Sequence, residues 1–198
     1  MKANREYRSV IELRTNEVDE YIVEGYATTF NQPYTLYSLN GFEVKEQVSP
    51  NAFDECDMSD VIMQYDHEGR VFARTRNKTL ELSIDSKGLF VRANLGGTEM
   101  GRQLYNDIKG GYIDRMSFGF VVEEDEKVYT NDFDTNQETC LRTITKISKL
   151  YDVSAVSIPA NDSTTINARK YCDGVIAELE TERFLRAKLK LKLKLEED

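Results

Sequence analysis

The sequence predicts an α+β domain in which many antiparallel strands form a closed or sandwiched sheet and a few helices lie outside it. The first two-thirds of the chain consists mostly of short runs with the alternating pattern of half-buried strands. One segment in this region has helical spacing instead, and helix-forming residues dominate after residue 162. With 198 residues, the chain is long enough for one domain with a full hydrophobic core.

Strands and one short helix are expected in the N-terminal part. Residues 8–14 and 21–30 are β-rich runs separated by a polar turn. A short helix is expected after Pro50, with Ala52 and Phe53 on its inner face.

The clearest hairpin in the sequence lies in the middle of the chain. Residues 79–84 place their apolar side chains on one face, a turn follows at 85–88, and the alternation resumes at 89–93. Before this pair, residues 61–63 form an apolar strand that runs into a polar segment. Functional side chains are often found where a strand leaves a sheet for a loop, so this strand end is a candidate position for chemistry.

A helix and three strands are expected next. Residues 98–111 begin with a threonine that can cap a helix, carry apolar side chains at helical spacing and end in a Gly-Gly pair. Strands are expected at 113–123, 140–147 and 149–158. The acidic and polar segment 123–138 has few large aliphatic residues and is expected to be a long hairpin loop.

The last part of the chain has a different composition. Up to about residue 187 it is rich in helix formers, although Gly174 is expected to interrupt the helix. Residues 188–195 then alternate Lys and Leu, which would give a strand one apolar and one basic face but would scatter leucine around a helix. Two interpretations stay open for this tail: a frayed, loosely attached end, or a docking segment for an acidic partner.

Composition and charge disfavour several function classes. The chain has 26 basic and 35 acidic side chains and a formal net charge of −9, which disfavours nucleic acid and anionic membrane surfaces as partners. No apolar stretch approaches the roughly 18 residues of a membrane span, and no secretory signal follows the first residues.

The cysteines and the lone histidine disfavour a metal site. Cys56, Cys140 and Cys172 are far apart and form no CxxC pair, which favours free thiols in a reducing cytoplasm. Zinc needs about three or four clustered nitrogen or sulfur ligands, which this set cannot supply. We therefore expect neither a metal nor another cofactor.

A single imidazole limits the acid–base chemistry of this chain. His67 is the only histidine, and it follows an apolar strand in the run Gln-Tyr-Asp-His-Glu. Ser117 lies in an apolar run, where a buried hydroxyl is costly unless it is hydrogen-bonded and where Gly119 allows a backbone to approach closely. Asp152 lies in an otherwise apolar strand, and carboxylates are rarely buried unpaired.

Histidine, serine and carboxylate are the components of a hydrolytic triad. Serine is a weak nucleophile that needs an adjacent base, and the base needs a third group to orient it and to stabilise its charged form. Structural explanations stay open for each residue: a hydrogen-bonded core or surface histidine at 67, a small strand residue at 117 and a surface-facing carboxylate at 152. In the triad interpretation, His67 is the base, Ser117 the nucleophile and Asp152 the partner of the imidazolium.

Ordered motifs give the chain a resemblance to the prohead serine proteases of tailed bacteriophages, the maturation peptidases of capsid assembly. The resemblance covers roughly residues 20–165. It is strongest around Ser117 and Asp152. The motifs that carry it are Glu24-Gly25-Tyr26-Ala27, Phe30-Asn31, Val48-Ser49-Pro50-Asn51-Ala52-Phe53, Asp66-His67-Glu68, Phe72-Ala73-Arg74-Thr75, Ser117-Phe118-Gly119-Phe120, Leu150-Tyr151-Asp152-Val153-Ser154 and Pro159-Ala160.

The resemblance implies a fold and an activity. The fold would be assemblin-like, as in the herpesvirus proteases: mainly an antiparallel β-barrel surrounded by a few helices. The family's roles imply His67 as general base and Ser117 as nucleophile. The third residue of the family is commonly Glu, and the matching Asp152 is one methylene shorter. If Asp152 does not orient His67, Asp66 or Glu68 is the next candidate.

The resemblance also implies a substrate and a location. The enzyme would be a serine endopeptidase that cleaves the major capsid protein in its scaffolding segment, inside the immature phage capsid in the host cytoplasm. Residues 1–165 would form the protease domain. Residues 166–198 would form a charged helical extension, dispensable for cleavage, that serves as a packaging or self-cleaved element. Autocleavage and a homodimer are expected by analogy, and backbone N–H groups of Ala160 and Asn161 are candidates for the oxyanion hole.

Two other function classes remain as alternatives. A non-catalytic β-domain of the same fold would bind capsid or scaffold protein without cutting it. A cysteine hydrolase would pair His67 with one of the three thiols, although Cys56 lies in an acidic run that disfavours a thiolate.

Overall fold

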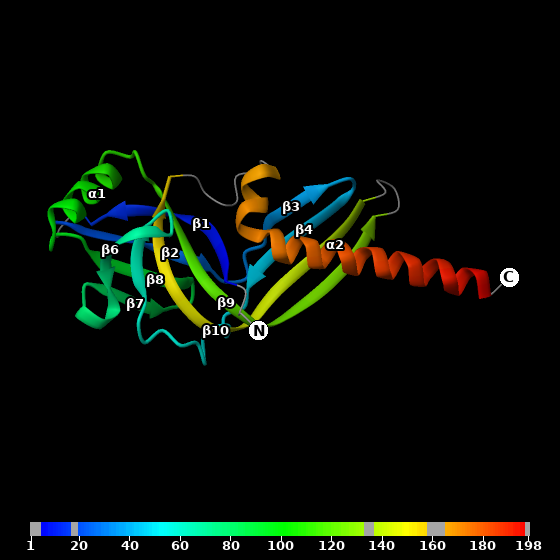
Figure 1. Ribbon diagram of the computed structural model, residues 1–198. Helices are drawn as coiled ribbons and strands as arrows, with labels where there is room; N and C mark the ends of the chain where they lie inside the picture. The colour runs from blue at the N-terminus through cyan, green and yellow to red at the C-terminus, as the bar shows by residue number, and fades with distance from the viewer. Residues whose placement is uncertain (1–4, 17–19, 133–136, 158–164, 197–198) are drawn as a thin grey trace.

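The computed structural model describes residues 5–16, 20–132, 137–157 and 165–196, which form a strand-rich body with two α-helices (Figure 1). In the described residues the elements are β1 (Glu6–Thr15), β2 (Ile22–Thr29), β3 (Tyr34–Leu39), β4 (Phe42–Val48), β5 (Ile62–Tyr65), β6 (Glu68–Arg74), a 3₁₀ turn (Thr75–Asn77), β7 (Leu80–Ile84), β8 (Gly88–Asn94), α1 (Glu99–Lys109), β9 (Arg115–Asp132), β10 (Gln137–Val156) and α2 (Thr165–Glu196).

The strands pair mostly antiparallel, which confirms the predicted α+β class. Their order is β3-β4-β10-β9-β1-β2-β8-β7, and β5 pairs with both β10 and β6. Two of the pairs, β4 with β10 and β5 with β10, are parallel.

The expected closed barrel is not formed. Within the described residues no strand ladder joins β6 to β7, so the sheet is open at this point. The chain leaves β6 through the 3₁₀ turn, and Lys78 adopts a left-handed conformation with φ 62°. This tight reversal brings Thr79 back to donate its N–H to the Arg74 carbonyl, and the two strands separate from there.

The predicted loop at 123–138 is wrong. β9 and β10 continue through most of this segment as a long antiparallel ribbon, with Glu126 opposite Thr143 and Asn131 opposite Glu138. The segment lacks large aliphatic residues because both faces of the ribbon are partly solvated beyond the core. The two strands expected at 140–147 and 149–158 are a single strand, β10, whose register with β9 shifts at several points.

The short helix expected after Pro50 is also wrong. Residues 50–55 form successive tight turns, in which the N–H of Ala52 bonds to the Ser49 carbonyl and that of Cys56 to the Phe53 carbonyl. Ala52 and Phe53 are nevertheless buried, as expected for an inner face.

Local signals located the middle hairpin and α1 correctly. β7 pairs with β8 across the predicted turn. The Thr98 side chain caps α1 by accepting from the N–H of Gly101, and the helix ends at Gly110.

α2 is one continuous helix, so Gly174 does not interrupt it and the Lys-Leu segment is helical. Its first part packs on the sheet, where Val175, Ile176 and Leu179 are buried. Farther along, Leu189 and Leu193 are exposed, and in Figure 1 this end of the helix projects from the body. No described helix is long and apolar enough to cross a membrane.

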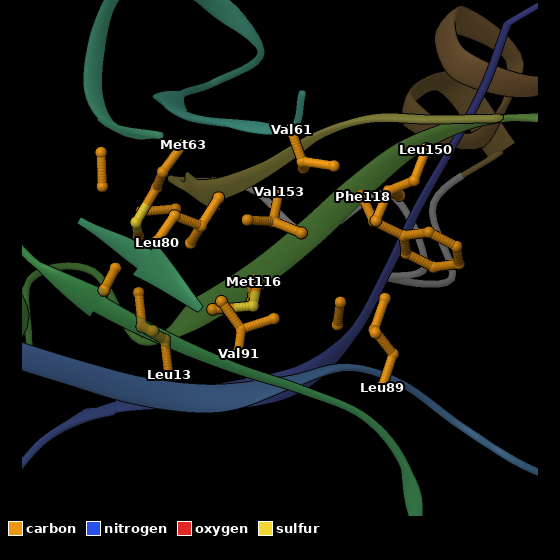
Figure 2. Packing of buried hydrophobic residues seen from close by; sticks show 14 of the residues in the cluster. Leu13, Val61, Met63, Leu80, Leu89, Val91, Met116, Phe118, Leu150 and Val153 are labelled. Atoms are coloured by element: carbon orange, nitrogen blue, oxygen red, sulfur yellow. The ribbon is translucent and has the colours of Figure 1, made fainter. Parts of the chain in front are cut away.

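Buried apolar residues form two separate clusters. The larger cluster packs against one face of β9 and β10 and includes the side chains drawn in Figure 2. The smaller cluster lies between β3, β4, β10 and α2. The labelled members of the large cluster are Leu13, Val61, Met63, Leu80, Leu89, Val91, Met116, Phe118, Leu150 and Val153.

A buried ionic network lies between the two clusters. On β4, Glu46 separates Val44 of the smaller cluster from Val48 of the larger one. The Glu46 carboxylate accepts hydrogen bonds from Arg8 and from Arg142, the latter at 2.7 Å. Burial alone would raise the pKa of Glu46, but the two guanidinium groups outweigh it and lower this pKa to about 2.

Candidate active site

His67 lies at the tip of the β5–β6 hairpin. Tyr65 pairs with Glu68, which leaves Asp66 and His67 as a two-residue turn with φ values of 49° and 60°. Positive φ at both central positions is the conformation that matches the twist of a hairpin, and Asp and His enter it more readily than most residues. The turn therefore fixes the position of the imidazole relative to strands β5 and β6.

The hairpin is attached to β10, which fixes the position of His67 relative to the sheet. β5 runs parallel to β10, with Ser154 opposite Gln64. The N–H of Asp66 donates to the Ala155 carbonyl at 2.9 Å. The Asp66 carboxylate accepts from the N–H of Ser157 at 2.9 Å and from its hydroxyl at 2.8 Å. Asp66 thus anchors the turn instead of orienting the imidazole.

Ser117 and Asp152 project from one face of the β9–β10 pair. Ser117 lies opposite Ser154, and Gly119 lies opposite Asp152. Because side chains alternate along a strand, Phe118 points to the other face, into the larger core cluster. Alternate residues of the apolar run around Ser117 therefore face the hydrophobic core and the candidate active site.

Three side chains from distant parts of the chain form one hydrogen-bonded series. Nδ1 of His67 lies 2.5 Å from Oδ1 of Asp152, and Nε2 lies 2.7 Å from Oγ of Ser117. A carboxylate can only accept, so Nδ1 carries the proton and Nε2 accepts from the serine hydroxyl. Ser117 and Asp152 are each 1% exposed, and the His67 side chain is 6% exposed. The structure brings all three predicted residues together.

Several neighbours of Asp152 were not among the predicted site residues. The Ser154 hydroxyl donates to Oδ1 of Asp152 at 2.8 Å. The Tyr7 ring lies against the imidazole, with 4.3 Å between the ring centroids. A Cβ atom on Gly119 would collide with the Asp152 carboxylate, so only glycine fits there without displacement. Strand alternation could have pointed to Ser154, whereas Tyr7 comes from β1 and no local pattern marks it.

The two cysteines whose side chains the structure describes lie in environments that suppress a thiolate. Burial raises the pKa of Cys56 to about 11, and burial also raises the pKa of Cys140. The side chain of Cys172 and the segment with Ala160 and Asn161 lie outside the described part of the structure. Among the residues described, no group of three or more His, Cys, Asp or Glu side chains could hold a metal ion.

Comparison with known proteins places the chain in a family. The model of the caudovirus prohead serine proteases matches residues 9–174, which include the three residues of the hydrogen-bonded series. The prohead protease of Enterobacteria phage HK97 is 29% identical over 176 residues, covering 87% of this chain and 70% of that protein. No solved structure matches the chain. The chain belongs to the caudovirus prohead serine protease family, whose members are peptidases.

Proposed function

We propose that this chain is a serine endopeptidase that cleaves the major capsid protein in its scaffolding segment while the immature capsid matures. Membership of the prohead protease family supports the substrate and the place of action, the inside of the immature capsid in the host cytoplasm. The observation that carries the proposal is the series Ser117–His67–Asp152, with 2.7 Å and 2.5 Å between its polar atoms. No other acid–base group is needed for acyl transfer.

The first half of the reaction is acylation of Ser117. Its Oγ attacks the peptide carbonyl carbon while Nε2 of His67 takes the hydroxyl proton. The imidazolium that forms is stabilised by the Asp152 carboxylate at Nδ1. His67 then gives the proton to the departing amine, the C–N bond breaks, and an acyl-enzyme remains on Ser117.

The second half is hydrolysis of the acyl-enzyme. His67 takes a proton from water as the water oxygen attacks the ester carbonyl, and it returns that proton to Oγ of Ser117 when the C–O bond breaks. The product is a free carboxylate. Both tetrahedral intermediates need preorganised donors for their oxyanion, and Ala160 and Asn161 remain our candidates.

The burial of Ser117 bears on how the activity is restrained. With 1% of the residue exposed, a peptide carbonyl reaches Oγ only after neighbouring groups move aside. A closed site of this kind suits a peptidase that stays inactive until it is enclosed with its substrate. Catalytic contacts also commonly tighten or rearrange when substrate binds.

Several finer expectations belong to the same proposal. The protease domain is proposed to end near residue 165, and the helical extension to act as a packaging or self-cleaved element. The packing of Val175, Ile176 and Leu179 on the sheet supports a structural role for this part of α2 as well. Autocleavage and a homodimer remain predictions from the family resemblance.

The decisive experiment mixes the purified protein with the capsid precursor of its own phage and follows the precursor's length. We expect the wild type to shorten the precursor and Ser117→Ala and His67→Ala to leave it intact. Ser83→Ala, at an exposed position of β7, is the matched control and should cleave like the wild type. Binding of the precursor without cleavage by the wild type would overturn the proposal in favour of a non-catalytic binding domain.

A further inference from the structure

One oxygen of the Asp152 carboxylate has no hydrogen-bond donor among the residues that the structure describes. Oδ1 accepts from His67 and from Ser154. Oδ2 is buried and, among the described residues, receives no hydrogen bond. Burying a carboxylate oxygen without a hydrogen-bond donor is energetically costly unless a positive charge lies nearby. That charge comes from Arg5, whose Nη1 lies 3.6 Å from Oδ2.

Arg5, which directly precedes β1, is held in this place by two tyrosines, Tyr151 of β10 and Tyr7 of β1. Its guanidinium lies over the Tyr151 ring, 3.7 Å from the centroid. Its Nη1 also donates to the Tyr7 hydroxyl at 3.5 Å. The register of β1 against β9, with Tyr7 opposite Gly119, sets Arg5 beside the site. The contact with Asp152 is thus built from elements that are far apart in the sequence.

We propose that Arg5 is a positioning residue of this site, and that its charge offsets the charge of Asp152 so that His67 stays available as a base at neutral pH. The inference rests on the proposed peptidase function. The Asp152 carboxylate lies 2.5 Å from Nδ1 of His67, and a negative charge beside an imidazole favours the charged form of the ring in general. An imidazolium that forms before substrate binds has no free Nε2 lone pair and cannot accept the Ser117 proton.

Three strands supply side chains that contact the imidazole or its partner Asp152. β10 supplies the Asp152 carboxylate and the Ser154 hydroxyl, β9 supplies the Ser117 hydroxyl, and β1 supplies the Tyr7 phenol and the Arg5 guanidinium. Within this set Asp152 favours the charged imidazole and Arg5 opposes it. The protonation of His67 therefore reports the balance between the two charges.

The separation of the charges sets the size of the effect. Nη1 of Arg5 lies 3.6 Å from Oδ2 of Asp152, and Nδ1 of His67 lies 2.5 Å from Oδ1 of the same carboxylate. The guanidinium and the protonated imidazole are therefore about 7 Å apart, with the carboxylate between them. In an effective dielectric near 20, charges at about this distance shift a protonation midpoint by roughly 1.5 pH units. The Arg5 side chain is 35% exposed, so screening reduces the expected shift to about one unit.

The test uses the fact that the chain has one histidine, so its imidazole NMR signals need no assignment. The titration midpoint of His67 is measured in a Ser117→Ala background, which prevents self-cleavage. Arg5→Gln should raise the midpoint by about one pH unit, because it removes a nearby positive charge. Arg5→Lys keeps the charge and should leave the midpoint within about 0.3 units of the parent. Arg76→Gln removes an exposed arginine that pairs with Asp60 and serves as the control.

Two outcomes would overturn the inference. The first is an unchanged midpoint in Arg5→Gln. The second is an equal shift in Arg5→Gln and Arg5→Lys, which would show that packing and not charge is responsible. If Arg5→Gln does not fold, Tyr151→Leu releases the guanidinium from its ring and should raise the midpoint by a smaller amount; no change there would also refute the inference.

An activity measurement separates this inference from the proposed function. In the Ser117-containing enzyme, the acidic limb of the pH–rate profile for precursor cleavage should move upward with Arg5→Gln by the same one unit or so. Failure of the wild type to cleave would reject the peptidase proposal, whereas the NMR midpoints would still decide the role of Arg5.

Discussion

Gly119 offers a sharp test of the geometry around Asp152. A Cβ atom on this residue would lie 2.8 Å from Cε1 of Tyr7 and 3.1 Å from Cγ of Asp152, and closer still to its Oδ2. Unstrained heavy atoms stay about 3.5–4.0 Å apart, so the added methyl group must displace the ring and the carboxylate by up to about 1 Å. Asp152 cannot move that far and keep its 2.5 Å contact with His67 within hydrogen-bond range.

We expect Gly119→Ala to lower kcat for precursor cleavage on the order of 100-fold, because displacements of about 1 Å have this effect in active sites. Overpacking should cost only about 1–3 kcal/mol of unfolding free energy, which urea denaturation measures. Gly97→Ala is the matched control, since no atom lies within 4 Å of its added Cβ. Full activity of Gly119→Ala, or an equal loss in Gly97→Ala, would refute the reasoning.

Three further predictions follow from the same structure. Asp152→Asn should reduce kcat on the order of 10²–10⁴-fold, because Asp152 orients and stabilises the imidazole without bonding to substrate. The loss should be smaller than that in Ser117→Ala. An unchanged kcat of Asp152→Asn in steady-state kinetics would mean that another carboxylate orients His67. Glu46 has a lowered pKa in the folded protein, about 2 against an ordinary 4.5, so its contribution is present above pH 4.5 and is lost as the pH falls toward 2. Glu46→Gln should therefore lower the unfolding free energy by about 3 kcal/mol at pH 7, with the difference from wild type shrinking in acid; urea unfolding curves with a pH-independent difference would contradict this. Truncation after residue 187 should leave cleavage and thermal stability unchanged, since Leu189 and Leu193 are exposed. Truncation after residue 165 removes three buried side chains worth about 1.5–3 kcal/mol each and should lower the melting temperature. An equal melting temperature for both truncations would show that α2 does not contribute to the core.

Local signals in the sequence were sufficient for some elements. The β7–β8 hairpin and α1 were predicted because their turn, cap and apolar spacing are all contained within about fifteen residues each. The three residues of the hydrogen-bonded series were found because each stands out from its surroundings: a lone imidazole, and a hydroxyl and a carboxylate within apolar strands. Their order also matched that of a known family.

Long-range pairing explains what the sequence could not show. The ribbon of β9 and β10 extends past the larger cluster and reaches the smaller one only through residues such as Tyr129 and Cys140, so its outer part has few apolar residues and resembles a loop. Residues 188–195 alternate like a strand, but Lys and Leu are good helix formers and they continue an existing helix. Arg5 and Tyr7 reach the site only because β1 pairs with β9, a contact between residues more than a hundred positions apart.

The most direct test of the account is reaction of the protein, mixed with the capsid precursor, with a fluorophosphonate, followed by peptide mapping by mass spectrometry. We predict one adduct, on Ser117, which is absent from His67→Ala and unaffected by prior alkylation of the thiols. Labelling of Ser117 that does not depend on His67, or continued precursor cleavage with Ser117 unlabelled and fully inhibited by the alkylating reagent, would contradict it.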